Sequence, residues 1–393
     1  MPYCNLTGAG TGEKGIKLYY RTYGRGPIKV LLIIGLAGTH DSWWPQIKGL
    51  AGTHVANDDE SVEIDGCLCE EGGVGVEVCA FDNRGMGLSS IPTKRSEYTT
   101  TIMAKDAIAL LDHLGWSKAH VFGHSMGGMI ACKLAALVPD RVLSLALLNV
   151  SGGGFECFPK FDRLALSIGI RFLMARTPEE RAAVDLDTHY TQEYLEELVE
   201  DCTRRDLLYR EYVKNISANG MQSNHGFEGQ INACWTHKMI DAEIEAIRNA
   251  GFLVSVIHGR HDVIARIGHA RRLAWKLHPY TKMVDLHGGH LVSHEKTTEV
   301  NEELLDLIRA SQANRSPQDW TNLADAATGW SGTWLMMSST NVGLLTNMSS
   351  VYCIIERLNR CLIYFFGLFV LLFEYAQRVL RRVKPVRVSP SLT

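Results

Sequence analysis

Residues 119–128 read Ala-His-Val-Phe-Gly-His-Ser-Met-Gly-Gly, and this stretch decides the fold. Val121 and Phe122 predict a short buried strand that leads into a turn, and the apolar, small-residue stretch 126–137 predicts the helix that follows. Between them, Ser125 lies in the pattern Gly-x-Ser-x-Gly, which is typical of a sharp strand-to-helix turn that exposes a serine hydroxyl. The first N–H groups of such a helix point toward the place where a substrate oxyanion forms. The stretch therefore predicts a nucleophilic serine at the edge of a sheet.

Short apolar runs alternate with helical patterns in the rest of the chain. This alternation predicts an α/β fold: a mostly parallel central sheet of about eight strands, the first antiparallel, with helices on both faces. Strands are predicted at residues 16–23, 29–34, 76–81, 142–148, 252–257 and 283–286, and helices at 104–114 and 300–308.

Two segments interrupt this alternation. Residues 51–75 are acidic and glycine-rich, which predicts a surface loop inserted into the core. Residues 153–250 are helical and charged and contain no clear strand, so we interpret them as a helical lid, called the lid segment below. Residues 1–152 and 251–310 are then the two parts of one α/β core.

Composition narrows the class of protein. The 393 residues are 46% hydrophobic and 21% charged, as in an ordinary globular chain. The net charge of −3 gives no reason to expect nucleic-acid binding. The ten cysteines have no regular spacing, and Cys67 and Cys69 lack the second pair of a zinc site, so reduced thiols are expected. No apolar secretory segment opens the chain, so a cytoplasmic location is predicted.

A serine needs a base, and the base needs an orienting carboxylate, before it becomes a nucleophile at neutral pH. Asp262 follows the strand predicted at 252–257, and His290 follows the strand predicted at 283–286. Loops at the carboxyl ends of parallel strands share one rim of a sheet, so both side chains are expected to meet Ser125.

Two backbone amides are candidates for the oxyanion hole. A glycine-rich turn follows the strand at 29–34, and the N–H of Leu36 lies in it. The N–H of Met126 opens the helix after the serine. Two preorganised donors at a developing alkoxide each contribute roughly a hundredfold or more in rate.

Five motifs in one order make the chain resemble the α/β-hydrolase superfamily, in its lipase, esterase and lactonase group. The resemblance covers about residues 15–310. It rests on Gly35-Leu36, residues 82–89, residues 123–128, Gly259 with Asp262, and Gly288-Gly289-His290.

The resemblance implies a triad of Ser125, Asp262 and His290, with Leu36 and Met126 as oxyanion donors, and needs no cofactor and no metal. The serine turn at residues 123–128 is similar to those of monoacylglycerol lipases and of small enol-lactone and aminoacrylate hydrolases, so this turn does not indicate which substrate is cleaved. Serine at this position argues against the epoxide-hydrolase and dehalogenase branches, which carry aspartate there. Many relatives have His-Gly before the oxyanion residue, whereas this chain has Ile34 before its glycine, and a histidine's supporting hydrogen bonds are lost.

Other polar residues near these motifs have simpler interpretations. His258, His261, His287 and His294 are less favoured as the base, because only His290 follows the double glycine that a close approach to the serine turn requires. Residues 82–89 are interpreted as a structural turn.

Two residue pairs near the start of the core are further candidates for a functional role. Trp43 and Trp44 fit pocket lining and core packing equally well. His54 and Asp59 match an acyltransferase-like spacing, which chance explains better because they lie in the inserted loop.

The C-terminal part falls outside the family pattern. Residues 311–350 are rich in Ser, Thr, Asn and Gly, which predicts a flexible linker. Residues 351–393 form a hydrophobic-basic tail in which residues 361–373 carry no charge. We favour an anchor at the cytoplasmic face of a membrane, either interfacial or a short transmembrane helix. A helix packed on the core and a poorly folded artefact of gene prediction remain open.

The sequence thus predicts a serine hydrolase that cleaves a carboxylic ester or a related small-molecule acyl substrate. Two interpretations from other classes stay open: a small-ligand receptor on the same fold with slow or single turnover, and a membrane-tethered scaffold with a vestigial site. The sequence indicates no oligomeric state.

Overall fold

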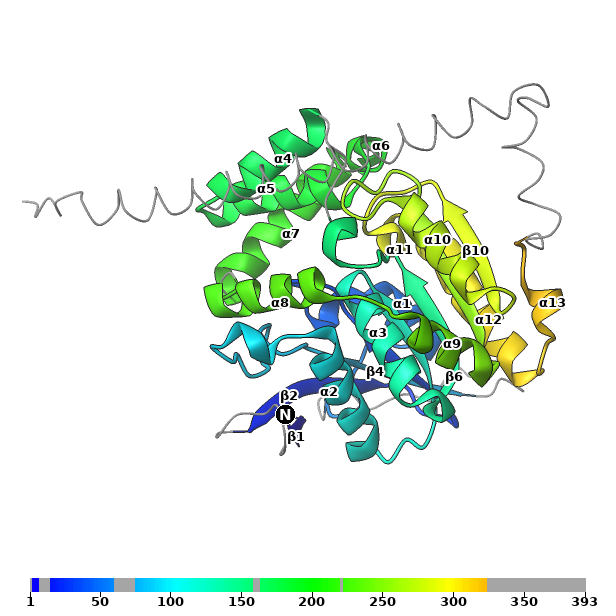
Figure 1. Ribbon diagram of the computed structural model, residues 1–393. Coiled ribbons are helices and arrows are strands. Elements are labelled where there is room, and N and C mark those ends of the chain that lie inside the picture. Colours follow the sequence, from blue (N-terminus) through cyan, green and yellow to red (C-terminus); the bar gives the residue numbers. More distant parts are fainter. Residues whose placement is uncertain (1, 7–14, 60–74, 158–162, 220–221, 324–393) are drawn as a thin grey trace, which may run out of the picture. The chain divides into compact units, whose positions relative to one another are not determined.

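The computed structural model describes residues 2–6, 15–59, 75–157, 163–219 and 222–323 (Figure 1). The chain divides into two compact units, Met1–Leu323 and Ala324–Thr393, and every described residue lies in the first. Most of the predicted linker, the whole tail at 351–393 and residues 60–74 of the predicted loop therefore lie outside the described residues.

An eight-stranded sheet forms the centre of the first unit, in the order β1-β2-β4-β3-β5-β6-β9-β10. β1 and β2 pair antiparallel, β2 joins β4 antiparallel, and the remaining neighbours are parallel. This confirms the predicted fold class, although the short β1 was not predicted. The strands are β1 (Tyr3–Leu6), β2 (Ile16–Tyr23), β3 (Ile28–Ile33), β4 (Val76–Phe81), β5 (Ala119–His124), β6 (Val142–Leu148), β9 (Leu253–Gly259) and β10 (Thr281–Leu286).

Alternate side chains of each central strand face opposite sides of the sheet, and both sides are buried. Leu31 and Ile33 of β3 belong to one hydrophobic cluster, whereas Val30 and Leu32 belong to the other. This pattern explains why the central strands are continuous apolar runs. The first face is covered by α2 (Thr100–His113), α3 (Met126–Leu137), α9 (Asp241–Ala250) and α10 (Ile267–Leu277), and the second by α1 (Trp44–Ala51), α11 (Val292–Glu295) and α12 (Thr297–Gln312).

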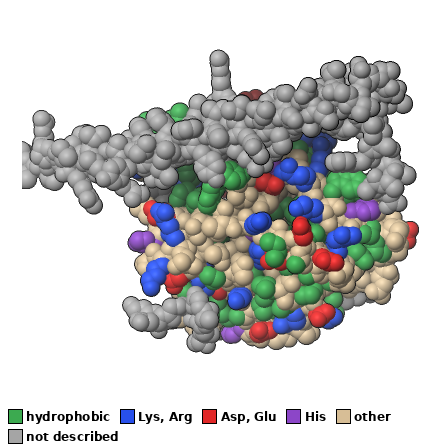
Figure 2. Space-filling view, viewed as in Figure 1, with side chains coloured by type: hydrophobic (Ala, Val, Ile, Leu, Met, Phe, Trp, Pro, Cys, Tyr) green, Lys and Arg blue, Asp and Glu red, His purple; other side chains and the backbone are tan. Residues whose placement is uncertain are grey.

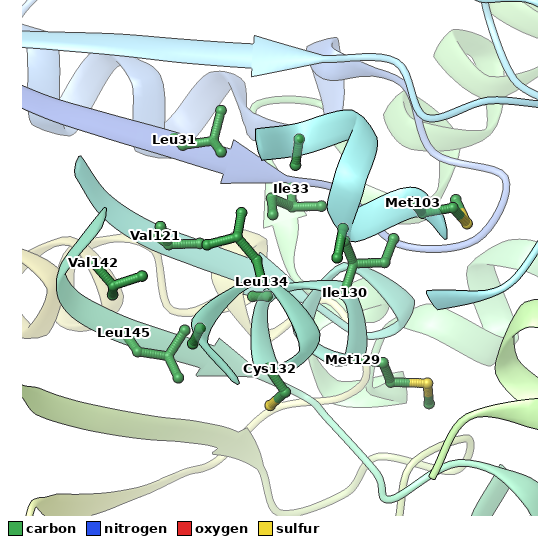
Figure 3. Packing of buried hydrophobic residues seen from close by; sticks show 14 of the residues in the cluster. Leu31, Ile33, Met103, Val121, Met129, Ile130, Cys132, Leu134, Val142 and Leu145 are labelled. Carbon is green, nitrogen blue, oxygen red and sulfur yellow. The ribbon is translucent and has the colours of Figure 1, made fainter. Parts of the chain in front are cut away.

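Helix α3 fixes the serine turn on the sheet. Figure 3 shows Ile130 and Leu134 of α3 in one packed layer with Ile33 and Val121 of the strands. All four side chains are fully buried, and truncating a buried leucine such as Leu134 to alanine costs about 2–5 kcal/mol. The start of α3 is therefore held rigidly against β3 and β5.

The lid segment contains most of the helices that do not cover the sheet. Its helices α4 to α7, green in Figure 1, gather on the side of the molecule away from β1 and β2, whereas α8 contacts α2 and α3. Contacts join α4 to α5, and α7 to both α5 and α6. Its elements are α4 (Arg163–Met174), α5 (Pro178–His189), α6 (Gln192–Glu196), β7 (Leu198–Val199), β8 (Cys202–Thr203), α7 (Arg204–Asn219) and α8 (Asn224–Thr236).

Two details of the lid segment differ from the sequence expectation. β7 and β8 form a small antiparallel hairpin where no strand was expected. α9 lies inside the predicted boundaries of the segment, yet it packs on α3 and its Ile244 and Ile247 join the core cluster. α9 is thus part of the helical layer that covers the sheet.

The residues after α12 also differ from the expectation. The linker was predicted to begin at residue 311, but α12 extends to Gln312 and α13 spans Pro317–Trp320. Trp320 is buried, and its Nε1 donates a 2.9 Å hydrogen bond to the Val254 carbonyl. A linker beginning at 311 was therefore wrong for the described residues up to 323, because Ser311, Trp320 and Thr321 donate to backbone carbonyls of β6, β9 and β10.

The surface carries mixed charge. On the face shown in Figure 2, basic and acidic side chains are interspersed, with hydrophobic side chains between them. Within the described ranges, no helix combines the length and the apolar character that crossing a bilayer requires.

Candidate active site

Ser125 lies at the point where β5 turns into α3, and its backbone is strained. Its φ of 54° and ψ of −120° are rare for a residue with a side chain. A Cβ on Gly123 would lie 2.3 Å from the Gly127 carbonyl oxygen, and a Cβ on Gly127 would lie 2.0 Å from the Ile33 oxygen. Both flanking glycines are therefore required by backbone contacts. The turn holds the Ser125 hydroxyl at the carboxyl edge of the sheet.

The structure brings the three predicted side chains together. His290 Nε2 lies 3.1 Å from the Ser125 hydroxyl, and His290 Nδ1 lies 2.8 Å from Asp262 Oδ2. Asp262 follows β9 and His290 follows β10, and these two strands pair in parallel. Their carboxyl ends therefore share the rim on which Ser125 lies. Both Asp262 and His290 are buried, at 8% and 4% exposure, so water competes little for these hydrogen bonds.

Asp262 is held as a carboxylate by four donors. Its Oδ1 accepts from the N–H groups of Ile264 and Ala265 at 2.8 and 2.9 Å, and Oδ2 accepts from His290 and from the Asn149 amide at 2.8 Å. Burial alone would raise the pKa of Asp262, but the charges of His290 and His258 and the side-chain hydrogen bonds from His290 and Asn149 lower it to about 2. Asp262 is therefore ionised at neutral pH and can orient and stabilise the His290 imidazole.

Asn149 was not predicted as part of this site. It directly follows β6 and has a positive φ of 48°, and its side-chain amide also donates to the Gly289 carbonyl at 3.1 Å. It therefore ties the Asp262 loop to the His290 loop. The sequence signal is weak, since a lone asparagine after a strand most often marks a turn.

The four neighbouring histidines, His258, His261, His287 and His294, have other partners, although His258 Nε2 also lies 3.7 Å from Asp262 Oδ2. Within the described residues, none of them contacts Ser125. His258 donates to the Ala265 carbonyl, and His294 is hydrogen-bonded to the Ser42 carbonyl and to the Tyr190 hydroxyl. His287 is hydrogen-bonded to both His261 and Glu193.

The double glycine before His290 has a different reason from the expected one. It was interpreted as making room at the serine turn. Instead, a Cβ on Gly289 would lie 2.7 Å from the His189 carbonyl of the lid segment, and a Cβ on Gly259 would lie 2.1 Å from the Gly289 oxygen. The glycines allow α5 and the end of β9 to approach the His290 loop closely.

The two predicted oxyanion donors lie on either side of Ser125. A Cβ on Gly35 would lie 3.1 Å from the Ser125 Cβ, so the loop after β3 abuts the serine. Met126 is the first residue of α3. Within the described part of the chain, neither the Leu36 nor the Met126 N–H donates to a protein acceptor. Both amides are thus available to a substrate oxygen.

The turn at residues 82–89 supports the loop at residues 34–38, which contains Leu36 and is called the oxyanion loop below. This agrees with the interpretation of residues 82–89 as a structural turn. Asn83 donates to the Ile34 carbonyl at 2.8 Å, so it holds the strand end at which many relatives have a histidine. Asp82 accepts from the His40 backbone and ring, both at 2.8 Å. Arg84 forms a buried, bidentate ion pair with Asp106.

Two further imidazoles pack against His290. The His124 ring meets it edge-on at 4.9 Å and donates to the His290 carbonyl, and His189 of the lid segment stacks on it at 5.9 Å. Burial, together with a smaller contribution from the nearby His290, lowers the pKa of both rings to about 3. Both rings are therefore neutral near pH 7. His189 lies far from every motif in the sequence, so no local pattern indicated it.

The remaining candidates lie outside the site. Trp43 is 1% exposed in the core and meets His124 edge-on, whereas Trp44 is 57% exposed. His54 is exposed, and Asp59 forms a 2.6 Å ion pair with Arg21. Across the described ranges, no three His, Cys, Asp or Glu residues gather as a metal site.

Comparison with known proteins identifies the family. A family model described as the alpha/beta hydrolase fold matches residues 29–297. The chain therefore belongs to the α/β-hydrolase family, and the predicted resemblance is confirmed. Its hydrolase fold, its serine turn and the three meeting side chains agree with this membership.

Curated relatives match parts of the chain. A protein assigned as the carbamate hydrolase RutD, from Azorhizobium caulinodans, is 32% identical over 162 residues, which are 41% of this chain and 50% of the relative. Bifunctional epoxide hydrolase 2 from Sus scrofa is 32% identical over 35% of this chain and 21% of its own length. The chain thus spans half or less of these relatives.

Solved structures share the fold over a larger part. The enol-lactonase from Burkholderia xenovorans LB400 superposes with a TM-score of 0.58 at 21% identity, covering 78% of this chain and all of that one. A thermophilic esterase from Thermogutta terrifontis superposes with a TM-score of 0.56 at 18% identity, covering 79% and 99% of the two chains. These likenesses show the fold alone.

Proposed function

We propose that this hydrolase is a serine enzyme that cleaves a carboxylic ester or a related small acyl substrate through an acyl-enzyme on Ser125. The observation that carries the proposal is the continuous hydrogen-bonded line from the Ser125 hydroxyl through His290 to Asp262, at 3.1 and 2.8 Å. This is the order of nucleophile, base and orienting acid that acyl transfer requires.

Each residue has one role in the proposed reaction. His290 Nε2 takes the hydroxyl proton as Ser125 Oγ bonds to the substrate carbonyl carbon, and the carbonyl π electrons move to oxygen. The Leu36 and Met126 N–H groups stabilise that oxyanion. His290 then returns the proton to the leaving alcohol as its bond to the acyl carbon breaks. In the second half of the reaction, His290 takes a proton from water as the water oxygen bonds to the acyl carbon, and it returns the proton to Ser125 Oγ as the bond between the acyl carbon and Ser125 breaks.

The nucleophile limits the class of substrate. Serine opening an epoxide would leave an ether that this machinery has no means to hydrolyse, whereas an acyl ester is reversible at a carbonyl carbon. An ester, a lactone and a carbamate all pass through the same tetrahedral oxyanion, so the site supports this wider acyl class. The epoxide-hydrolase relative therefore supports the fold family rather than the reaction.

A substrate panel with a matched variant tests the proposal. Wild-type protein should turn over short p-nitrophenyl esters or lactones continuously, and Ser125→Ala should be inactive with an unchanged melting temperature. Turnover that stops after one equivalent would instead indicate the receptor alternative. Failure of a fluorophosphonate to label the protein would indicate a vestigial site.

A further inference from the structure

Gln230 of α8 joins the lid segment to the oxyanion loop. Its Oε1 accepts the Ala37 N–H at 2.9 Å, and its Nε2 donates to the Arg84 carbonyl at 3.0 Å. An N–H group requires an acceptor and a carbonyl requires a donor, so these two partners fix the orientation of the amide. Gln222 also donates to Oε1, at 2.9 Å. Gln230 itself has no exposed surface.

Ala37 is the residue at which the oxyanion loop is strained. Its φ of 59° lies in the left-handed region, which costs a residue with a Cβ roughly 1 kcal/mol or more. Ala37 directly follows Leu36, the candidate oxyanion donor, so the peptide plane between them adjoins the donor. If the Ala37 N–H lost its acceptor, the backbone of Ala37 would relax toward ordinary dihedral angles. This change would turn the neighbouring Leu36 N–H away from Ser125.

Helix α8 is docked closely enough to hold this position. A Cβ on Gly226 would lie 2.0 Å from the Gly85 oxygen, and a Cβ on Gly229 would lie 2.4 Å from the Tyr98 ring. Gly226 therefore lets the helix backbone lie directly on the turn at residues 82–89, and Gly229 lets it lie on the Tyr98 ring. The same turn holds the other end of the oxyanion loop through Asn83. The loop is thus clamped from the turn and from the lid segment.

We propose that Gln230 is a positioning residue for the oxyanion hole, through which helix α8 of the lid segment orients the Leu36 N–H toward the substrate oxygen. The inference rests on the proposed function and deepens it, because it makes oxyanion stabilisation depend on the side-chain amide of Gln230. Gln230 contacts no reacting atom in this assignment. It acts only through the Ala37 amide.

The test compares two variants of the full-length chain. Gln230→Met keeps the side-chain length but removes all three hydrogen bonds of the amide, to Ala37, Arg84 and Gln222. Asn232→Leu is the matched control on the same helix, since its amide donates to the Arg95 and Tyr98 carbonyls and touches no part of the oxyanion loop. Each variant is measured for kcat and KM on an ester, for inhibition by an alkyl boronic acid, and for amide hydrogen exchange at residues 35–38.

Gln230→Met should lower kcat about 10- to 100-fold, less than or equal to the loss of a whole oxyanion donor, with KM within about twofold. Boronate affinity should fall in parallel with kcat, because the tetrahedral boronate places an oxygen in the same hole. The Ala37 amide should exchange faster in Gln230→Met only. Asn232→Leu should lower stability while leaving kcat, boronate affinity and Ala37 exchange near wild type.

Three results would overturn the inference: unchanged Ala37 exchange in Gln230→Met, a fall in kcat without a fall in boronate affinity, or equal effects in both variants. The exchange measurement needs no turnover. A wild-type protein that hydrolyses no acyl substrate would therefore refute the proposed function, while protection of Ala37 would still decide whether Gln230 holds the loop.

Discussion

Replacing Asp262 with asparagine separates the shape of the orienting residue from its charge. The wild-type carboxylate accepts two backbone N–H groups on Oδ1, and His290 and Asn149 on Oδ2. An asparagine has one oxygen for these four donors. If that oxygen stays with the backbone, the amide NH₂ faces His290 Nδ1. The His290 proton then moves to Nε2, where it can no longer accept the Ser125 proton.

The size of the effect follows from the alternative orientation. Turning the amide to restore the productive tautomer leaves two buried backbone donors facing an NH₂ group, at about 1–3 kcal/mol each. The resulting cost of about 2–6 kcal/mol corresponds to roughly a 30- to 20,000-fold loss of rate. Loss of the carboxylate that stabilises the imidazolium adds to this, so we expect a fall in kcat of about 10⁴-fold.

Steady-state hydrolysis of a water-soluble ester measures the loss, with Ser125→Ala as the zero-activity reference. Melting temperature and circular dichroism should show that Asp262→Asn is folded. KM should change little, since Asp262 does not reach the substrate. An Asp262→Asn variant that keeps kcat within tenfold of wild type would refute the assignment of Asp262 as the orienting acid.

Three further predictions concern stability, pH and the tail. Gly127→Ala should unfold the protein or sharply lower its melting temperature, because the new Cβ would lie 2.0 Å from a backbone oxygen, whereas Gly268→Ala, with nothing within 4 Å, should leave it unchanged. Because its pKa is lowered from 3.8 to about 2, the Asp262 carboxylate should contribute about 2 kcal/mol to the free energy of unfolding above pH 4. This contribution should be lost as the pH falls toward 2, so acid denaturation of Asp262→Asn should be less steep in that range. Deleting the basic, apolar residues 351–393 should abolish pelleting with anionic liposomes but leave ester turnover intact; full-length protein that stays in the supernatant would contradict the predicted anchor.

Local patterns predicted most of the site because its main residues lie within sequence motifs. The glycines around Ser125 are required by contacts within a few residues or with a neighbouring strand, so they leave a short, readable pattern. Asp262 and His290 could be placed because each ends a parallel strand, and parallel strands share a rim.

Other parts of the site depend on contacts between distant segments. Asn149 lies 113 residues from Asp262, and Gln230 lies 193 residues from Ala37. Neither residue type has a local pattern that indicates its partner. The anchoring of residues 317–320 was missed for the same reason, since Trp320 and the following Thr321 donate to strand carbonyls far away in the sequence.

Labelling with a fluorophosphonate, followed by peptide mass spectrometry, tests the central claim most directly, because it reports which side chain is the activated nucleophile without requiring the natural substrate. The account predicts one adduct, on Ser125, formed rapidly by wild-type protein and about 10³-fold or more slowly by His290→Ala, and absent in Ser125→Ala. No adduct on the wild-type protein, or an adduct on another residue that persists in Ser125→Ala, would contradict it.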